Sequence, residues 1–228
     1  MLIVFDLDDT LYLESDFVKS GFRAVEEYLR ADGPAGFHDI AWDLFQSGVR
    51  RTIFDQALAR MGRSPTPALL RQLVEVYRSH AGEIRLAQDS ERCLESIQGK
   101  VDLGLITDGP SVAQWNKVRL LGLARIIKDI LVTEDLGAGA GKPSPLAFKK
   151  LQGNREGTAC VYIGDNPCKD FQGPKELGWR TIRIRRPLGL HHDQPDLAGA
   201  VADHHLPDLD PVPSLVRFWA PLDERGRP

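Results

Sequence analysis

The chain opens on an uninterrupted run of apolar positions that ends in acids. Residues Leu2 to Phe5 are all apolar, and Asp6, Asp8 and Asp9 follow within four positions. A short apolar run of this kind is typical of a strand that is buried on both faces of a parallel sheet. Ligands of open α/β sheets bind outside the carboxyl ends of the strands, so these acids are candidate functional residues.

The pattern then changes to a helical period without a strand signal. Apolar residues recur every three or four positions from Val18 to Leu29. This spacing predicts a helix that begins with Ser15 or Asp16 as its N-cap and ends at Gly33-Pro34. Further amphipathic segments follow at residues 37–44, 53–61 and 67–77. We therefore expect residues 16–84 to form an all-helical cap domain.

Strands and helices alternate after this segment. Apolar runs predict strands at residues 101–106, 130–132, 160–163 and 181–184, a short strand near 203–206 and a last helix near 214–219. Alternating strands and helices form right-handed βαβ units, with a parallel sheet covered on both faces. The predicted fold class is therefore α/β: a doubly wound, Rossmann-like core of residues 1–15 and 85–228 with the all-helical cap domain inserted.

Composition and charge argue against nucleic acid and anionic membranes as partners. The 228 residues are 42% apolar, with a net charge of −3 and a pI near 6.1. This balance gives no basic surface for nucleic acid or an anionic membrane. The chain shows no secretory signal and no apolar run near the ~18 residues of a membrane span, so we expect a cytoplasmic protein. Cys93, Cys160 and Cys168 are odd in number and lack CxxC spacing, which favours reduced thiols.

The crowded acids after the first strand indicate a cation site. Carboxylates this close raise one another's pKa unless a cation or a hydrogen-bond donor offsets their charge. A solvated acidic turn is the main alternative. A calcium loop is excluded, because Leu11 stands where that loop needs glycine and Phe17 stands at its last ligand position.

Other predicted strands also end in polar groups. Thr107 follows the second strand, Asp165 follows the fourth, and a glycine-rich loop at residues 137–141 leads to Lys142 after the third. Parallel strands gather such groups into one pocket, which solvated turns do not explain. The loop is not a nucleotide-binding motif: Pro143 stands where a P-loop needs Ser or Thr, and Lys142 replaces the third glycine of the dinucleotide fingerprint.

These residues resemble the four motifs of the haloacid dehalogenase-like superfamily of phosphotransferases and hydrolases. The motifs occur in the family's order, as Asp6-Leu7-Asp8-Asp9-Thr10, Thr107-Asp108-Gly109, Lys142-Pro143 and Gly164-Asp165-Asn166-Pro167-Cys168-Lys169-Asp170. The resemblance covers nearly all of the chain from Leu2 to about Asp208. An insertion between the first two motifs looks like the branch with a helical cap. The proline usual before the second-motif helix is missing around Gln88-Asp89-Ser90.

The resemblance implies a role for each acid. Asp6 would be the nucleophile that forms an aspartyl-phosphate. Asp8, with a pKa raised by its neighbours, would protonate the leaving oxygen and then take a proton from water. Mg²⁺ would be held by the carboxylates of Asp6 and Asp165 and by the Asp8 backbone carbonyl. Asp170 would orient a metal-bound water from the outer shell.

The resemblance also implies how the phosphate is bound. Thr107 and the backbone N–H groups of Asp108 and Gly109 would grip its oxygens, and Lys142 would offset the gathered negative charge. Halide displacement needs no acid, so Asp8 favours cleavage of phosphate esters over dehalogenation.

The expected function is therefore that of a Mg²⁺-dependent phosphatase acting on a small cytosolic phosphomonoester, such as a sugar phosphate, phosphoglycolate or a nucleoside monophosphate. A phosphomutase of the same family and a non-catalytic phosphoacceptor domain are the alternatives. We expect the cap to select the substrate, and Arg50 and Arg51 are candidate contacts for phosphate or carboxylate. Exposed arginines at a helix start are the other interpretation. His191-His192 and His204-His205 are expected to be surface residues.

Overall fold

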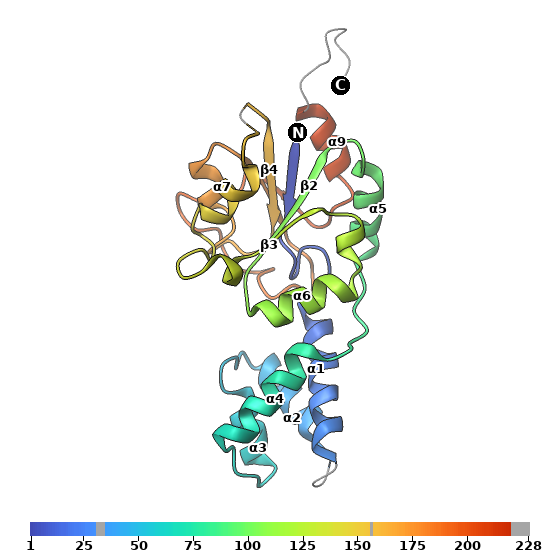
Figure 1. Ribbon diagram of the computed structural model, residues 1–228, viewed down its shortest axis with the longest axis vertical. Coiled ribbons are helices and arrows are strands. Elements are labelled where there is room, and N and C mark those ends of the chain that lie inside the picture. The colour runs from blue at the N-terminus through green and yellow to red at the C-terminus, as the bar shows by residue number, and fades with distance from the viewer. Residues whose placement is uncertain (31–34, 156, 220–228) are drawn as a thin grey trace. The chain divides into compact units, whose positions relative to one another are not determined.

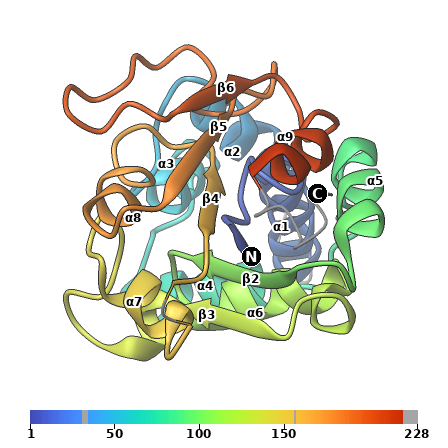
Figure 2. The same cartoon turned by 90° about the horizontal axis from the view of Figure 1, so that it is seen from above.

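A computed structural model describes residues 1–30, 35–155 and 157–219. The described residues form a six-stranded, wholly parallel sheet in the order β3-β2-β1-β4-β5-β6 (Figures 1 and 2). The strands are β1 (Leu2–Phe5), β2 (Asp102–Thr107), β3 (Asp129–Val132), β4 (Cys160–Gly164), β5 (Arg180–Ile184) and β6 (His204–Leu206). The predicted α/β class with a parallel sheet is confirmed.

Helices cover both sides of this sheet. Helices α7 and α8 lie on one side, and α5 and α9 lie on the other (Figure 2). The bounds are α5 (Gln88–Ile97), α6 (Ser111–Leu120), α7 (Leu146–Gln152), α8 (Gln172–Glu176) and α9 (Val212–Trp219), with 3₁₀ turns η2 (Leu123–Arg125) and η3 (Thr133–Leu136). The layered arrangement is that of a doubly wound fold.

The central strand explains how the sheet delivers its first acid. All four residues of β1 are fully buried, and burial of such side chains contributes roughly 1.5–3 kcal/mol each. Strand β1 pairs with β2 on one side and with β4 on the other. The ladder continues one residue further, because the Asp6 N–H donates to the Ile163 carbonyl at 2.8 Å. Asp6 is therefore fixed at the carboxyl end of the sheet.

Residues 15–84 form a second compact unit, which we call the helical unit (Figure 1, blue to teal). Its helices are α1 (Glu14–Leu29), α2 (Phe37–Gln46), α3 (Ile53–Arg60) and α4 (Pro67–Ser79). Rings in edge or tilted contact form its core, contributed by Phe17, Phe22, Phe37, Phe45, Phe54 and Tyr77. The expectation of an all-helical insertion is confirmed.

The first helix begins earlier than its sequence pattern predicts. Helix α1 starts at Glu14 rather than after Ser15 or Asp16, because Asp9 Oδ1 accepts the Glu14 N–H at 2.9 Å. An acid from upstream thus satisfies a free amide of the first turn. The predicted helix end at Gly33-Pro34 lies outside the described residues.

The points where the chain leaves and re-enters the sheet domain are tied together. The Ala87 N–H donates to the Leu11 carbonyl at 3.0 Å. Buried Arg186 donates to the Thr10 carbonyl at 2.7 and 3.1 Å, and to the two carboxylate oxygens of Asp89 at 2.9 and 2.8 Å. Both ends of the insertion are therefore held by the core. No helix among the described residues is long and apolar enough to cross a bilayer.

Candidate active site

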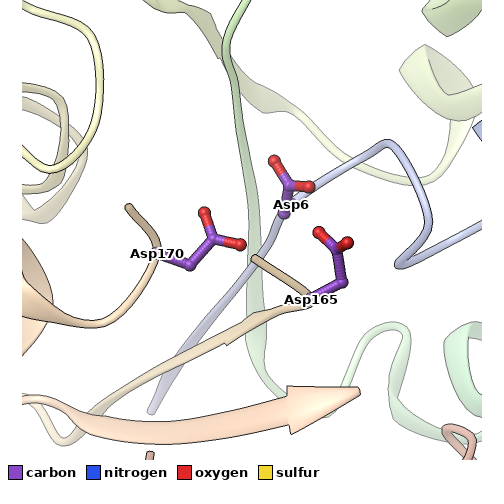
Figure 3. A group of neighbouring side chains, drawn as sticks. All are labelled: Asp6, Asp165 and Asp170. Atoms are coloured by element: carbon purple, nitrogen blue, oxygen red, sulfur yellow. The ribbon is translucent and has the colours of Figure 1, made fainter. Parts of the chain in front are cut away.

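Three buried carboxylates meet at the carboxyl end of the sheet. Asp6 follows β1, Asp165 follows the adjacent strand β4, and Asp170 lies in the loop before α8. Among the described residues, these three acids form a group in which one oxygen of each lies within 4.8 Å of the others (Figure 3). The side chains come from segments about 160 residues apart and point toward one another. The structure thus brings the two proposed carboxylate ligands into one place.

Lys142 reaches into this group of acids. Its Nζ atom lies 2.5 Å from Asp6 Oδ1, 2.7 Å from Asp170 Oδ1 and 2.9 Å from the Tyr162 hydroxyl. Burial alone would lower the pKa of Lys142, but the charges of Asp170 and Asp6 outweigh it and raise that pKa well above its ordinary value. Lys142 is therefore a cation, and it compensates two of the acids.

Burial still disfavours the charged forms of Asp6 and Asp165. Burial raises the pKa of Asp6 to about 7 against the opposing effect of Lys142. Burial, reinforced by Asp170 and Asp6, also raises the pKa of Asp165 well above its ordinary value. Asp165 Oδ2 is buried and has no hydrogen-bond partner among the described residues. A buried carboxylate oxygen without a partner, next to the carboxylates of Asp6 and Asp170, is suited to bind a hard divalent cation, so these residues fit Mg²⁺.

Asp170 is held more firmly than its neighbours. Burial alone would raise its pKa, but Lys142 and Lys169 outweigh burial and lower it. The Asn166 N–H donates to Asp170 Oδ2 at 2.8 Å. Gly164 leaves the space for this carboxylate, because a Cβ there would lie 2.5 Å from Asp170 Oδ2. The structure therefore places the Asp170 carboxylate within the same group as Asp6 and Asp165, the two proposed metal ligands.

The expectation that neighbours raise the pKa of Asp8 is wrong. Burial acts in that direction, but the ammonium of Lys117 outweighs it and lowers the pKa of Asp8. Lys117 Nζ lies 2.7 Å from both carboxylate oxygens. The hydroxyl of Tyr12 and the amide of Gln114 also donate to this carboxylate. The sequence gives no sign of the pairing, since Lys117 is more than a hundred residues away.

The Thr107-Asp108-Gly109 segment lies at the end of β2 and is already engaged within the core. Thr107 Oγ1 donates to Gln114 Oε1 at 2.9 Å. Asp108 Oδ1 accepts from Thr133 Oγ1 at 2.7 Å and from the Lys142 N–H at 3.2 Å. Asp108 therefore anchors the loop that carries Lys142, while the phosphate contacts of this segment stay a prediction.

Arg50 and Arg51 lie in the turn between α2 and α3 of the helical unit, and both are exposed. Arg50 Nη1 donates to the Phe45 and Val49 carbonyls at 2.6 and 2.8 Å, and its guanidinium lies 4.1 Å from the centre of the Phe45 ring. Arg50 is thus used within its own turn. Substrate contact by either arginine stays a prediction.

Several residues of the site carry no sequence signal. Tyr162 lies inside the apolar run of β4, and Gln114 and Lys117 lie in a helix without a motif. His191 is half-buried rather than on the surface, with Nε2 2.8 Å from Asn166 Nδ2. For Gln114 and Lys117, the pattern that could have pointed to them is a pair of polar residues on one face of a helix.

Comparisons with known proteins agree with this geometry. A family model described as haloacid dehalogenase-like hydrolase matches residues 1–178. Glyceraldehyde 3-phosphate phosphatase from Methanocaldococcus jannaschii is 28% identical over 227 residues, which cover 94% of this chain and 96% of that protein.

Two solved structures share the fold. The magnesium-bound HAD-hydrolase YfnB from Bacillus subtilis has a TM-score of 0.70 at 22% identity, covering 94% of this chain and 97% of its own. A 2-haloacid dehalogenase from Pseudomonas syringae pv. Tomato DC3000 has a TM-score of 0.66 at 27% identity, covering 96% and 99%. Together with the family match over most of the chain, these similarities show that the protein belongs to the haloacid dehalogenase-like hydrolases.

Proposed function

We propose that the protein is a Mg²⁺-dependent phosphatase that hydrolyses a small phosphomonoester through an aspartyl-phosphate on Asp6. The observation that carries the proposal is the setting of Asp6, which is buried at the end of β1 beside the Lys142 ammonium. It also lies close to Asp165, whose Oδ2 has no hydrogen-bond partner in the part of the chain that the structure describes. The similarity to a glyceraldehyde 3-phosphate phosphatase supports a small phosphorylated metabolite as substrate. Asp8 favours cleavage of a phosphate ester over dehalogenation, the activity for which the Pseudomonas protein is named.

The chain's own residues account for both halves of the reaction. A carboxylate oxygen of Asp6 attacks phosphorus, and the bond from phosphorus to the alcohol oxygen breaks while the protonated form of Asp8 supplies a proton to that oxygen. Lys117 opposes this form because it lowers the pKa of Asp8. Asp8 then takes a proton from the water that attacks the aspartyl-phosphate, which releases phosphate and restores Asp6. Thr107 and Lys142 hold and neutralise the transferred group.

Mg²⁺ would be held by the Asp6 and Asp165 carboxylates and the Asp8 carbonyl, where it would offset the charge that the substrate phosphate adds. Asp170, fixed by Lys142 and the Asn166 N–H, would orient groups around it.

Hydrolysis of p-nitrophenyl phosphate tests this proposal. Activity should require Mg²⁺, disappear on chelation and fall by at least ~10³-fold in Asp6→Asn, since the nucleophile is lost. Asp193→Asn is the matched control, because that side chain is 97% exposed, and it should keep full activity. Activity that persists in Asp6→Asn would refute the assignment of the nucleophile.

The same preparation separates the alternatives. A phosphomutase would move phosphate between positions of a sugar phosphate and release little inorganic phosphate. A regulatory phosphoacceptor would accumulate phosphoprotein without turnover. A panel of sugar phosphates, phosphoglycolate and nucleoside monophosphates should identify the substrate class by the highest kcat/KM. A cytoplasmic location and the lack of nucleic-acid or membrane partners remain predictions.

A further inference from the structure

Helix α6 buries two long polar side chains. Gln114 and Lys117 are three residues apart and so share one face of the helix, and each is 3% exposed. Burying such groups is costly unless they are hydrogen-bonded or paired. The partners of Gln114 and Lys117 therefore indicate the role of this face of α6.

Both side chains meet at the carboxylate of Asp8. Lys117 Nζ lies 2.7 Å from each Asp8 oxygen. Gln114 Nε2 donates to Asp8 Oδ2 at 3.3 Å, while Gln114 Oε1 accepts from Thr107 Oγ1 at 2.9 Å. The Tyr12 hydroxyl donates to the same carboxylate from the turn after β1. Asp8 is thus held from two elements, and one amide links it to the threonine at the end of β2.

The second motif leaves room for this amide. Gly109 has φ +132°, and a Cβ there would lie 2.7 Å from Gln114 Nε2. Any other residue at that position would therefore push the amide away from Asp8. The amide's orientation also follows from its partners, since a carboxylate requires the N–H₂ side.

We propose that Gln114 and Lys117 are positioning residues, which hold the Asp8 carboxylate in the orientation that its proton transfers require. This inference rests on the proposed phosphatase function. Helix α6 begins at Ser111, two residues after the Thr107-Asp108-Gly109 segment. One element would therefore fix both the predicted phosphate-binding segment and the proton-transfer group. A displacement of about 1 Å in such a group can cost ~10²-fold in rate.

Two aryl esters that differ in their leaving group test the proposal. Phenyl phosphate expels a more basic oxygen than p-nitrophenyl phosphate and so depends more on protonation by Asp8. In Gln114→Met and Lys117→Met, kcat/KM should fall ~10–100-fold with phenyl phosphate and less than ~3-fold with p-nitrophenyl phosphate. Lys149→Met, at an exposed position on α7, is the matched control and should change neither value.

Combining each variant with Asp8→Asn shows whether it acts through Asp8. Once Asp8 no longer transfers protons, Gln114→Met and Lys117→Met should cause no further loss in kcat/KM. Lys117→Arg, which keeps the cation, should restore much of the activity with phenyl phosphate. If Lys117→Met shows no cooperative thermal transition, the uncharged change Gln114→Met carries the test.

The possible failures are distinguishable. Equal losses with both esters, a gain in activity, or a full additional loss on top of Asp8→Asn would overturn the positioning role while the phosphatase function stands. A wild-type protein that hydrolyses neither ester would overturn the proposed function, and the positioning role with it.

Discussion

Gly164 shows how one residue shapes the candidate site. It is the last residue of β4, and Asp170 Oδ2 occupies the space that a side chain would need. Gly164→Ala should therefore displace the Asp170 carboxylate and lower the free energy of unfolding by about 1–3 kcal/mol, as overpacking does. Denaturant unfolding and p-nitrophenyl phosphate hydrolysis should both report the change. Unaltered stability and activity would show that the carboxylate has room to move.

We expect the three cysteines to differ in reactivity because they differ in burial. Burial raises the pKa of Cys93 to about 12, and burial also raises the pKa of Cys160. Only the thiolate is nucleophilic, so both thiols stay protonated and inert at pH 8. Ellman's reagent should modify one thiol of the folded protein, the exposed Cys168, and three after denaturation. Cys168→Ser should abolish the rapid reaction; rapid modification that remains in this variant would contradict the prediction.

At the scale of elements, Arg186 joins the end of β5 to the turn after β1 and the start of α5. It is 7% exposed, and its guanidinium is bonded to the Thr10 carbonyl and the Asp89 carboxylate. Removing one member of a buried ion pair leaves the other charge uncompensated. Arg186→Met should therefore lower the free energy of unfolding by ~3–5 kcal/mol in urea titrations. A loss no larger than that of an exposed change such as Arg119→Met would show that the pair adds little.

This pair also predicts a pH dependence. Burial would raise the pKa of Asp89, but hydrogen bonds from Arg186 and the Leu209 N–H outweigh it and lower the pKa below 3.8. A depressed pKa gives stability that is complete above 3.8 and is lost as the pH falls through the folded-state value. Urea unfolding of Arg186→Met between pH 5 and 3 should vary less steeply than that of the wild type. Parallel curves would contradict this assignment.

Elements were predictable where one local pattern decides them. The apolar run of β1 and the helical period from Val18 to Leu29 each predict their element from a few neighbouring residues. The start of α1 was missed because its first amide is satisfied by Asp9, outside the helix. The pairing of Asp8 with Lys117 was missed for the same kind of reason: it depends on the packing of α6, which no short segment encodes.

At the scale of the whole molecule, the sheet domain and the helical unit have separate cores. The helical unit is centred on aromatic rings such as Phe22, whereas the sheet packs Phe148, Tyr162 and Trp179 together. Each compact unit can therefore lose its packing by itself. Phe22→Ala should cost ~3–5 kcal/mol within the helical unit and split thermal unfolding into two steps. Circular dichroism at 222 nm should record the earlier step, and a single shifted transition would argue that the units unfold as one.

The two ends of the inserted helical unit are held close together by the sheet domain. Because the Ala87 N–H meets the Leu11 carbonyl inside the sheet domain, the exit and entry points stand side by side whatever lies between them. Domain insertions succeed at sites where closely spaced ends impose no stretch on the host. We expect the helical unit to select the substrate, so replacing it with a different helical module whose termini lie close together should change the substrate preference while β1 and β4 stay unchanged.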